Sequence, residues 1–308
     1  MTTAIEFARI TKVYQRVFSE ERTEALGDVT FEVSPGEVCG FLGPNGAGKT
    51  TTIGILMGFL FADSGQARVL DYAPGDIRAK EQIGFLPENF SFYRFLTGPK
   101  LLALHLTLSG RRVPDPFGFI ERLLAQVKLA GYESLRIARY SRGMVQRLGI
   151  AQALIGDPQL LVFDEPTSGL DPAGRKEVLD LVHSLKQQGK TVFLSSHILT
   201  EVEQICDRVV IIDRGRVIRS GRLEEILRAG GRVEVVVDRL PDQAVAAATH
   251  CGAEIDRGPH GIRLRVDAGH KRELIETLWA AGCDVVRVNP IKDTLEDVFL
   301  NLVGGGTS

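Results

Sequence analysis

The feature that most constrains this chain is the stretch GPNGAGKTT at residues 43–51, together with its flanks. The apolar run 38–42 precedes it, and residues from about 50 to 61 carry apolar side chains at helical spacing. This order of strand, glycine-rich turn and helix is the context in which GxxxxGK[ST] binds phosphate. Glycines let the backbone N–H groups approach phosphate oxygens at the positive end of a helix dipole. The stretch therefore predicts a nucleoside triphosphate site.

Within this stretch, different residue types serve different parts of the ligand. Lys49 supplies a mobile positive charge for the outer phosphates, and the Thr50 hydroxyl is placed to hold Mg²⁺. The residues that we expect to surround the phosphates are Gly43, Pro44, Asn45, Gly46, Ala47, Gly48, Lys49, Thr50 and Thr51.

Length and composition exclude several classes of protein. The 308 residues suffice for one large domain and a small one, and 44% hydrophobic with 25% charged residues is typical of a soluble globular protein. A formal net charge of −2 gives no indication of a nucleic-acid partner. No apolar run approaches the roughly 20 residues that span a bilayer, and the first residues lack the apolar core of a signal peptide.

The cysteines are scattered and contain no CxxC pair, which argues against a zinc site. We expect them to be buried apolar residues of a reduced, cytoplasmic protein. They are Cys39, Cys206, Cys251 and Cys283.

A second chemical centre follows the apolar run LLVF, where Asp164 and Glu165 stand at the carboxyl end of a predicted strand. Ligands of open α/β sheets bind at this edge. Adjacent side chains of a strand point in opposite directions, so the two acids need different functions. Asp164 is suited to hold the shell of a magnesium ion, and Glu165 is suited to face the attacking water. TVFLSSH repeats the pattern, and its His197 could hydrogen-bond a γ-phosphate.

Four weaker candidates each have an ordinary structural explanation. Tyr14 could stack on an adenine ring or be a half-buried residue at a strand end. Glu88 follows the predicted strand IGFLP and could reach a metal shell, or be a solvated loop acid. Ser141 and Gly143 begin a predicted helix that is either a second anion-binding N-terminus or merely capped.

Taken in order, these motifs resemble the ATP-binding subunit of an ABC transporter over roughly residues 4–222. GPNGAGKTT corresponds to Walker A, LLVFDEP to Walker B and its glutamate, SGLD at 168–171 to the D-loop, and YSRGMVQR to the signature. The resemblance implies that Glu165 and His197 act in ATP hydrolysis with Lys49. It also implies that Asp171, and Ser141 and Gly143 of a second copy, contribute to the nucleotide site.

Three departures from the family pattern narrow the resemblance. In the signature, Arg142 replaces a glycine and Met144 a glutamine. Glu88 stands at the position of the Q-loop glutamine, and the loop after Tyr14 is several residues longer than is usual in the family. The combination of LPE with YSxGMxQR resembles the ABC-2-type exporters and the daunorubicin-type multidrug-resistance ATPases. We assign Thr50, Asp164 and Glu88 as the expected magnesium shell.

The expected fold is α/β: an ABC ATPase domain over residues 1–222, with a mixed sheet, an antiparallel β subdomain and a helical subdomain at about 90–158. After a linker at 223–231, the order βαββαβ and a last helix at 232–303 predict a small ferredoxin-like α+β domain, followed by a flexible tail at 304–308. The last helix either packs on its own sheet or contacts a partner. Its apolar face holds Leu295, Val298, Phe299 and Leu302.

The predicted function is ATP hydrolysis, with ATP and Mg²⁺, by the nucleotide-binding subunit of an ABC-2-type exporter. The expected partners are a second copy or a paralogous ATPase subunit, paired head to tail, and a separate transmembrane permease at the cytoplasmic face of the membrane. No nucleic-acid partner is expected. Two alternatives remain: an importer ATPase, and a soluble ABC ATPase that remodels ribosomes or nucleic acid.

Overall fold

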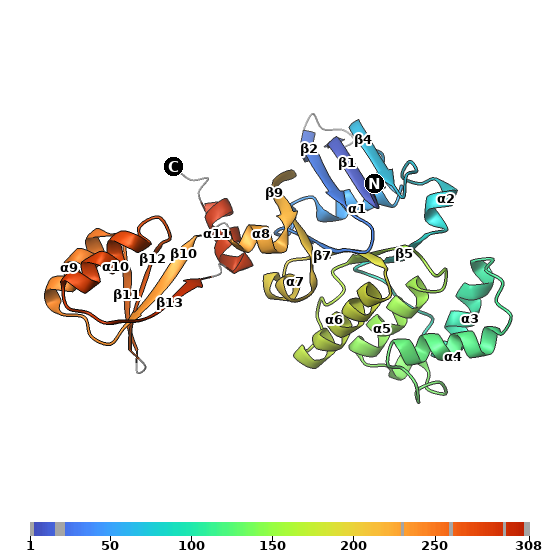
Figure 1. Ribbon diagram of the computed structural model, residues 1–308. Helices are drawn as coiled ribbons and strands as arrows, with labels where there is room; N and C mark the ends of the chain where they lie inside the picture. Colours follow the sequence, from blue (N-terminus) through green and yellow to red (C-terminus); the bar gives the residue numbers. More distant parts are fainter. Residues whose placement is uncertain (1–2, 16–21, 229–230, 259–260, 292–293, 305–308) are drawn as a thin grey trace. The chain divides into compact units, whose positions relative to one another are not determined.

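The computed structural model describes residues 3–15, 22–228, 231–258, 261–291 and 294–304. The chain divides into two compact units, Met1–Arg222 and Leu223–Ser308, which we describe separately as the first and second units (Figure 1). The predicted flexible tail at 304–308 falls almost entirely outside the described residues.

The first unit is built on a six-stranded sheet. Its first five strands are parallel and the last is antiparallel. The inner strands are buried along their whole length, which explains their uninterrupted apolar sequences. In spatial order the strands are β5 (Ile83–Leu86), β6 (Leu160–Asp164), β7 (Thr191–Ser196), β3 (Val38–Leu42), β8 (Arg208–Asp213) and β9 (Arg216–Arg222).

A second, antiparallel sheet covers part of the first unit, in the order β2 (Arg22–Val33), β1 (Ile5–Gln15) and β4 (Ser64–Val69). Strands β1 and β2 pair antiparallel, in agreement with the predicted antiparallel β subdomain. Aromatic rings join the two sheets: Phe31 lies 4.8 Å from Phe7, 5.5 Å from Phe41 and 5.9 Å from Phe193, measured between ring centroids. Stacked and tilted rings at these distances add to the burial of their apolar surface.

Helices surround the sheet edge and form the predicted helical insertion, in which α3, α4 and α5 pack against one another. The helix after the glycine-rich turn is shorter than the expected span of 50–61, because Met57 caps it and Gly58 turns the chain with a φ of 69°. The helices of this unit are α1 (Lys49–Leu56), α2 (Ile77–Lys80), α3 (Gly98–Leu108), α4 (Pro116–Gln126), the 3-10 turn η1 (Ile137–Arg139), α5 (Arg142–Ala153), α6 (Pro172–Gln187) and α7 (Leu199–Ile205).

The second unit has a four-stranded antiparallel sheet in the order β11, β12, β10, β13. This order confirms the predicted split βαβ arrangement, and α9 and α10 cover one face of the sheet with a shared apolar core. The elements are α8 (Leu223–Arg228), β10 (Arg232–Val237), α9 (Asp242–His250), β11 (Glu254–Gly258), β12 (Gly261–Asp267), α10 (Lys271–Ala280), β13 (Val285–Ile291) and α11 (Leu295–Gly304).

Two segments of the second unit refine the sequence analysis. Helix α8 occupies most of the predicted linker at 223–231, and α11 packs against α8. On α11, Leu295 is buried, Val298, Phe299 and Leu302 are half-buried, and Leu300 is 61% exposed. The limits proposed for the accessory domain remain a prediction.

All four cysteines are buried and unpaired. Burial raises the pKa of the Cys39 and Cys206 thiols, which keeps them protonated. Among the described residues, no helix is long and apolar enough to cross a bilayer.

The aromatic contact between the two sheets makes a stability prediction. Phe193 is fully buried against Phe31 and Phe41, so we expect Phe193→Ala to lower the free energy of unfolding by about 3–5 kcal/mol. The matched change Phe61→Ala, at a side chain that is 80% exposed, should stay within about 0.5 kcal/mol. Urea unfolding of the full chain measures both, and equal midpoints for the two variants would contradict the assigned core.

Candidate functional site

A cavity of about 300 Å³ lies at the edge of the central sheet where β3, β6 and β7 end. Parallel strands bring their carboxyl ends to the same edge, so residues more than 100 positions apart in the sequence meet here. The lining residues are Ala25, Asn45, Gly46, Gly48, Lys49, Thr50, Thr51, Glu88, Asp164, Glu165, Ser168 and His197.

The loop after β3 has the backbone geometry that its glycines were expected to permit. Gly48 caps α1 with a φ of 108°, and a Cβ there would lie 2.8 Å from the Ala25 carbonyl oxygen. A Cβ on Gly43 would lie 2.3 Å from the backbone oxygen of Ile212. Both positions therefore require glycine, which lets the backbone of the loop approach its neighbours closely. The N-terminus of α1 consequently opens onto the cavity, where it favours an anion.

Lys49 and Glu165, which both line the cavity, form an ion pair. The Lys49 Nζ atom lies 3.3 Å from Glu165 Oε1, and both side chains are more than 90% buried. Lys49 also donates to the carbonyl oxygens of Gly43, at 2.7 Å, and Pro44, at 3.4 Å. The ammonium group is thus fixed beside the loop whose N–H groups would receive phosphate.

Glu165 is held from its other side by His197, whose Nδ1 lies 2.7 Å from Glu165 Oε2. The Glu165 backbone has a φ of 49°, which is uncommon for a residue with a side chain, and its N–H donates to Ser195 Oγ at 2.9 Å. Strained backbone of this kind concentrates at functional sites. The carboxylate therefore has one oxygen facing a cation and the other facing an imidazole.

Asp164 lies on β6 and accepts a hydrogen bond from Ser195 Oγ at 2.6 Å. Burial raises the pKa of this carboxyl, and the nearby charges of Glu88 and Glu165 raise it further, although the Ser195 bond and Lys49 oppose the shift. A cation would offset this burial of negative charge.

The predicted magnesium shell fits this arrangement. Thr50, Glu88 and Asp164 all line the same cavity. Mg²⁺ is usually held by one or two carboxylates together with substrate phosphates and waters, rather than by a complete protein cage. Among the described residues, no cluster of three or more His, Cys, Asp or Glu side chains could hold a metal. The assignment of these three residues to Mg²⁺ remains a prediction.

Seven predicted site residues do not line this cavity. Three of them, Gly43, Pro44 and Ala47, belong to the glycine-rich loop that frames it, and the other four lie elsewhere in the chain. Ser141 caps α5 by accepting from the Met144 N–H at 3.2 Å, and Asp171 caps α6 by accepting from the Gly174 N–H at 3.2 Å. Gly143 has open space beside it, because a Cβ there would meet nothing closer than 3.9 Å. Tyr14 is 42% exposed, near the end of β1. For these four residues to have their predicted roles, the ligand would have to extend beyond the cavity, or a second chain would have to contribute to the site.

The signature segment contacts the D-loop of its own chain. The guanidinium group of Arg142 lies against Gly169, so that a Cβ on Gly169 would be 2.4 Å from the guanidinium carbon. Gly169 has a φ of 68°, which also favours glycine. Arg142, one of the residues that depart from the family pattern, thus connects the start of α5 to the segment before α6.

Sequence reasoning missed the contributions of three residues. Ala25 and Ser168 line the cavity, and Ser195 connects the backbone of Glu165 to the side chain of Asp164. The only sequence signal for Ser195 is its position directly after the apolar run of β7. Ala25 could not be found from sequence, because β2 reaches the cavity only through tertiary packing.

Comparison with known proteins places this geometry in a family. Residues 26–168 match the family model described as ABC transporter. The chain is 34% identical to the bacitracin transport ATP-binding protein BcrA of Bacillus licheniformis over 100% of this chain and 99% of that protein. It is 32% identical to the Nod factor export ATP-binding protein I of Rhizobium etli over 98% and 94%, respectively.

A solved structure described as the ATP binding subunit of an ABC transporter superposes with a TM-score of 0.64. It is 32% identical in sequence and covers 73% of this chain and 92% of its own. The family match spans the glycine-rich loop and the two carboxylates that line the cavity. The chain belongs to the ABC transporter family, as one of its ATP-binding proteins.

Proposed function

We propose that this protein hydrolyses ATP as the nucleotide-binding subunit of an ABC-2-type exporter. The observation that carries the proposal is the position of Glu165, whose carboxylate lies between Lys49 and His197 at the edge of a cavity framed by the glycine-rich loop. A general base must lie within hydrogen-bond reach of the proton that it takes, and its partners must fix its orientation. Glu165 meets the second requirement through two contacts.

Each group of residues in the cavity has a separate role in the proposed reaction. The N–H groups of the loop and the N-terminus of α1 bind phosphate oxygens, and the Lys49 ammonium moves from Glu165 toward the outer phosphates. Glu165 then orients the attacking water and takes its proton, while His197 holds Glu165 and steadies the γ-phosphate. Mg²⁺, bound by Thr50 and Asp164 with Glu88, would neutralise charge on the phosphates.

A second copy of the chain would complete the site. Ser141 and Gly143 stand at the exposed start of α5, outside the cavity of their own chain, and Gly143 leaves room for a close approach. The N-terminus of α5 favours an anion in the same way as that of α1. We propose that it binds the γ-phosphate of ATP held by a partner subunit, either a second copy or a paralogue, in a head-to-tail pair.

The inference that transport is export rests on the names of the relatives and on the signature segment. One relative is named for Nod factor export and another for bacitracin transport. Glu88 and the segment YSRGMVQR agree with the exporter pattern, whereas an importer ATPase would be favoured by a glutamine at position 88 and a full LSGGQ. The absence of a strong positive net charge argues against the alternative of a soluble ATPase acting on nucleic acid.

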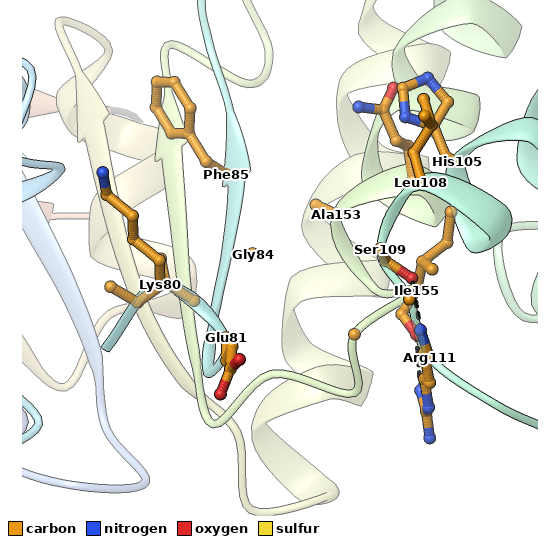
Figure 2. A pocket seen from close by; sticks show the side chains of 14 residues that line it. Lys80, Glu81, Gly84, Phe85, His105, Leu108, Ser109, Arg111, Ala153 and Ile155 are labelled. Carbon is orange, nitrogen blue, oxygen red and sulfur yellow. Dashed lines mark hydrogen bonds between the residues drawn. The ribbon is translucent and has the colours of Figure 1, made fainter. Parts of the chain in front are cut away.

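A permease would bind this subunit at the cytoplasmic face of the membrane. We propose that it docks in a cavity of about 650 Å³ between β5 and the ends of α3 and α5, where Leu108 is 72% exposed (Figure 2). Strand β5 forms one wall of this cavity through Gly84 and Phe85, and the chain continues from β5 to Glu88 in the nucleotide cavity. A partner seated here would therefore contact the strand that delivers Glu88 to ATP.

Replacing the proposed base should separate binding from turnover. We expect Glu165→Gln to lower kcat by about 10²–10⁴-fold, because the amide cannot take a proton, while ATP affinity is retained. With ATP, this variant should accumulate as a dimer on size-exclusion chromatography. Glu121→Gln on the exposed face of α4 is the control and should behave as wild type. Wild-type turnover in Glu165→Gln would refute the role assigned to Glu165.

Removing the ammonium group should weaken nucleotide binding itself. A hydrogen-bonded charge contributes about 1.5–3 kcal/mol, so we expect Lys49→Ala to raise the Kd for ATP about 10–100-fold. Titration with a fluorescent ATP analogue measures the change, and Lys176→Ala on exposed α6 provides the control. An unchanged Kd for Lys49→Ala would mean that the loop binds ATP by another mechanism.

The docking cavity can be tested without disturbing the nucleotide site. We expect Leu108→Arg to abolish co-purification with the permease and to leave basal ATP hydrolysis within about twofold of wild type, because burying an unpaired charge at an interface costs several kcal/mol. Phe61→Arg introduces the same charge at an exposed aromatic residue outside the cavity. If both variants retained the permease equally, this cavity would not be the docking surface.

A further inference from the structure

A third buried carboxylate, besides those of Asp164 and Glu165, lies close to the nucleotide cavity but does not line it. Glu201, on α7, is 7% exposed, and its Oε2 accepts a hydrogen bond from the Thr167 hydroxyl at 2.5 Å. Its other oxygen, Oε1, is buried without a hydrogen bond and lies 3.8 Å from the Arg175 guanidinium. This carboxylate has no part in the hydrolysis mechanism described above.

The surroundings of Glu201 make its charge costly. It shares a small internal space with apolar side chains, among them Val182, Leu194 and Val202. Burying an ionised carboxylate among apolar groups costs several kcal/mol unless cations and donors compensate for lost hydration. One hydroxyl and one guanidinium that is 39% exposed compensate only in part. Stability alone therefore gives little reason for a carboxylate at this position.

The contacts of Glu201 connect two segments that both reach the nucleotide cavity. Thr167 precedes Ser168, which lines the cavity and whose N–H donates to the Glu165 carbonyl oxygen at 3.1 Å. Glu201 lies in the first turn of α7, four residues after His197, which contacts the Glu165 carboxylate. The hydrogen bond between Thr167 and Glu201 thus joins the segment that follows the proposed base, Glu165, to the helix that follows its partner His197.

Arg175 extends the link along the D-loop. Its Nε donates to the Leu170 carbonyl oxygen at 3.0 Å, while its NH1 forms the ion pair with Glu201. The segment 167–170 is therefore fixed at its first residue by the Glu201 carboxylate and at its last by Arg175. Because Arg142 lies against Gly169 in the middle of this segment, the start of α5 also depends on its position.

We propose that Glu201 is a positioning residue for ATP hydrolysis: its carboxylate fixes the segment 167–170 relative to His197, so that Glu165 is held in the orientation that takes the proton from water. The inference rests on the proposed function. It assigns Glu201 no contact with nucleotide. Loss of the link should therefore reduce turnover and leave ATP binding unchanged, because the groups that bind ATP remain in place.

The test replaces each end of the link in the full-length chain. Thr167→Val removes only the hydroxyl at nearly constant volume, whereas Thr167→Ser retains it. We expect Thr167→Val to lower kcat about tenfold with the Kd for ATP within twofold of wild type, and Thr167→Ser to restore kcat to within twofold. Glu201→Gln should lower kcat by at least threefold. The double variant should be no slower than Thr167→Val, because both changes break the same link.

Controls separate positioning from general loss of structure. Glu276→Gln makes the same chemical change at the exposed ion pair with Arg272 and should leave kcat unaltered. Thermal unfolding establishes that each variant is folded at the assay temperature. If Thr167→Val or Glu201→Gln is folded and retains wild-type kcat, the inference is overturned. Should Thr167→Val fail to fold, Glu201→Gln alone decides.

Failure of the proposed function would look different. If the wild-type chain hydrolyses no ATP, or if its hydrolysis does not depend on Glu165, the proposed function is wrong. If hydrolysis depends on Glu165 and yet neither end of the link affects kcat, only the role of Glu201 is wrong.

Discussion

The buried ion pair between Lys49 and Glu165 is the contact on which the rest of the site depends. Two opposite charges can be buried together only when hydrogen bonds satisfy the donors and acceptors that the ion pair leaves unused. Gly43, Pro44 and His197 provide those bonds. When ATP binds, the Lys49 ammonium would contact the phosphates in place of Glu165. The Glu165 carboxylate would then be free to act on water. The same contact therefore stabilises the buried site and prepares the groups for their proposed functions.

The sheet makes this contact possible. Strands β3, β6 and β7 are adjacent and parallel, so the glycine-rich loop, the two carboxylates and His197 all emerge at one edge. The buried rings of Phe31, Phe41 and Phe193 fix the antiparallel sheet against this framework. Because packed interiors resist small displacements, the positions of the charged groups are set by the apolar core beneath them.

Around this centre, a second set of polar contacts controls orientation. Ser195 connects Asp164 to the backbone of Glu165, and the proposed link through Glu201 connects the D-loop to the helix after His197. Arg142 adds the start of α5 to this set by lying against Gly169. In a head-to-tail pair, α5 would face the ATP of the partner. A change at one nucleotide could thereby reach the other through these contacts, within the proposed pair.

The sequence by itself determined the site through local patterns, because the loop GPNGAGKTT, the acids after LLVF and the histidine after TVFLSS are each defined by neighbouring residues. It also predicted an antiparallel β subdomain and the split βαβ order of the second unit. Only the tertiary structure decided how Ala25 reaches the cavity and that Ser141, Gly143, Tyr14 and Asp171 lie outside it. These outcomes depend on contacts between residues far apart in the chain, which spacing and composition do not encode. The sequence also does not distinguish a buried helix carboxylate from an exposed one. Glu201 is buried because α7 packs on the sheet, and this packing is known only from the tertiary structure.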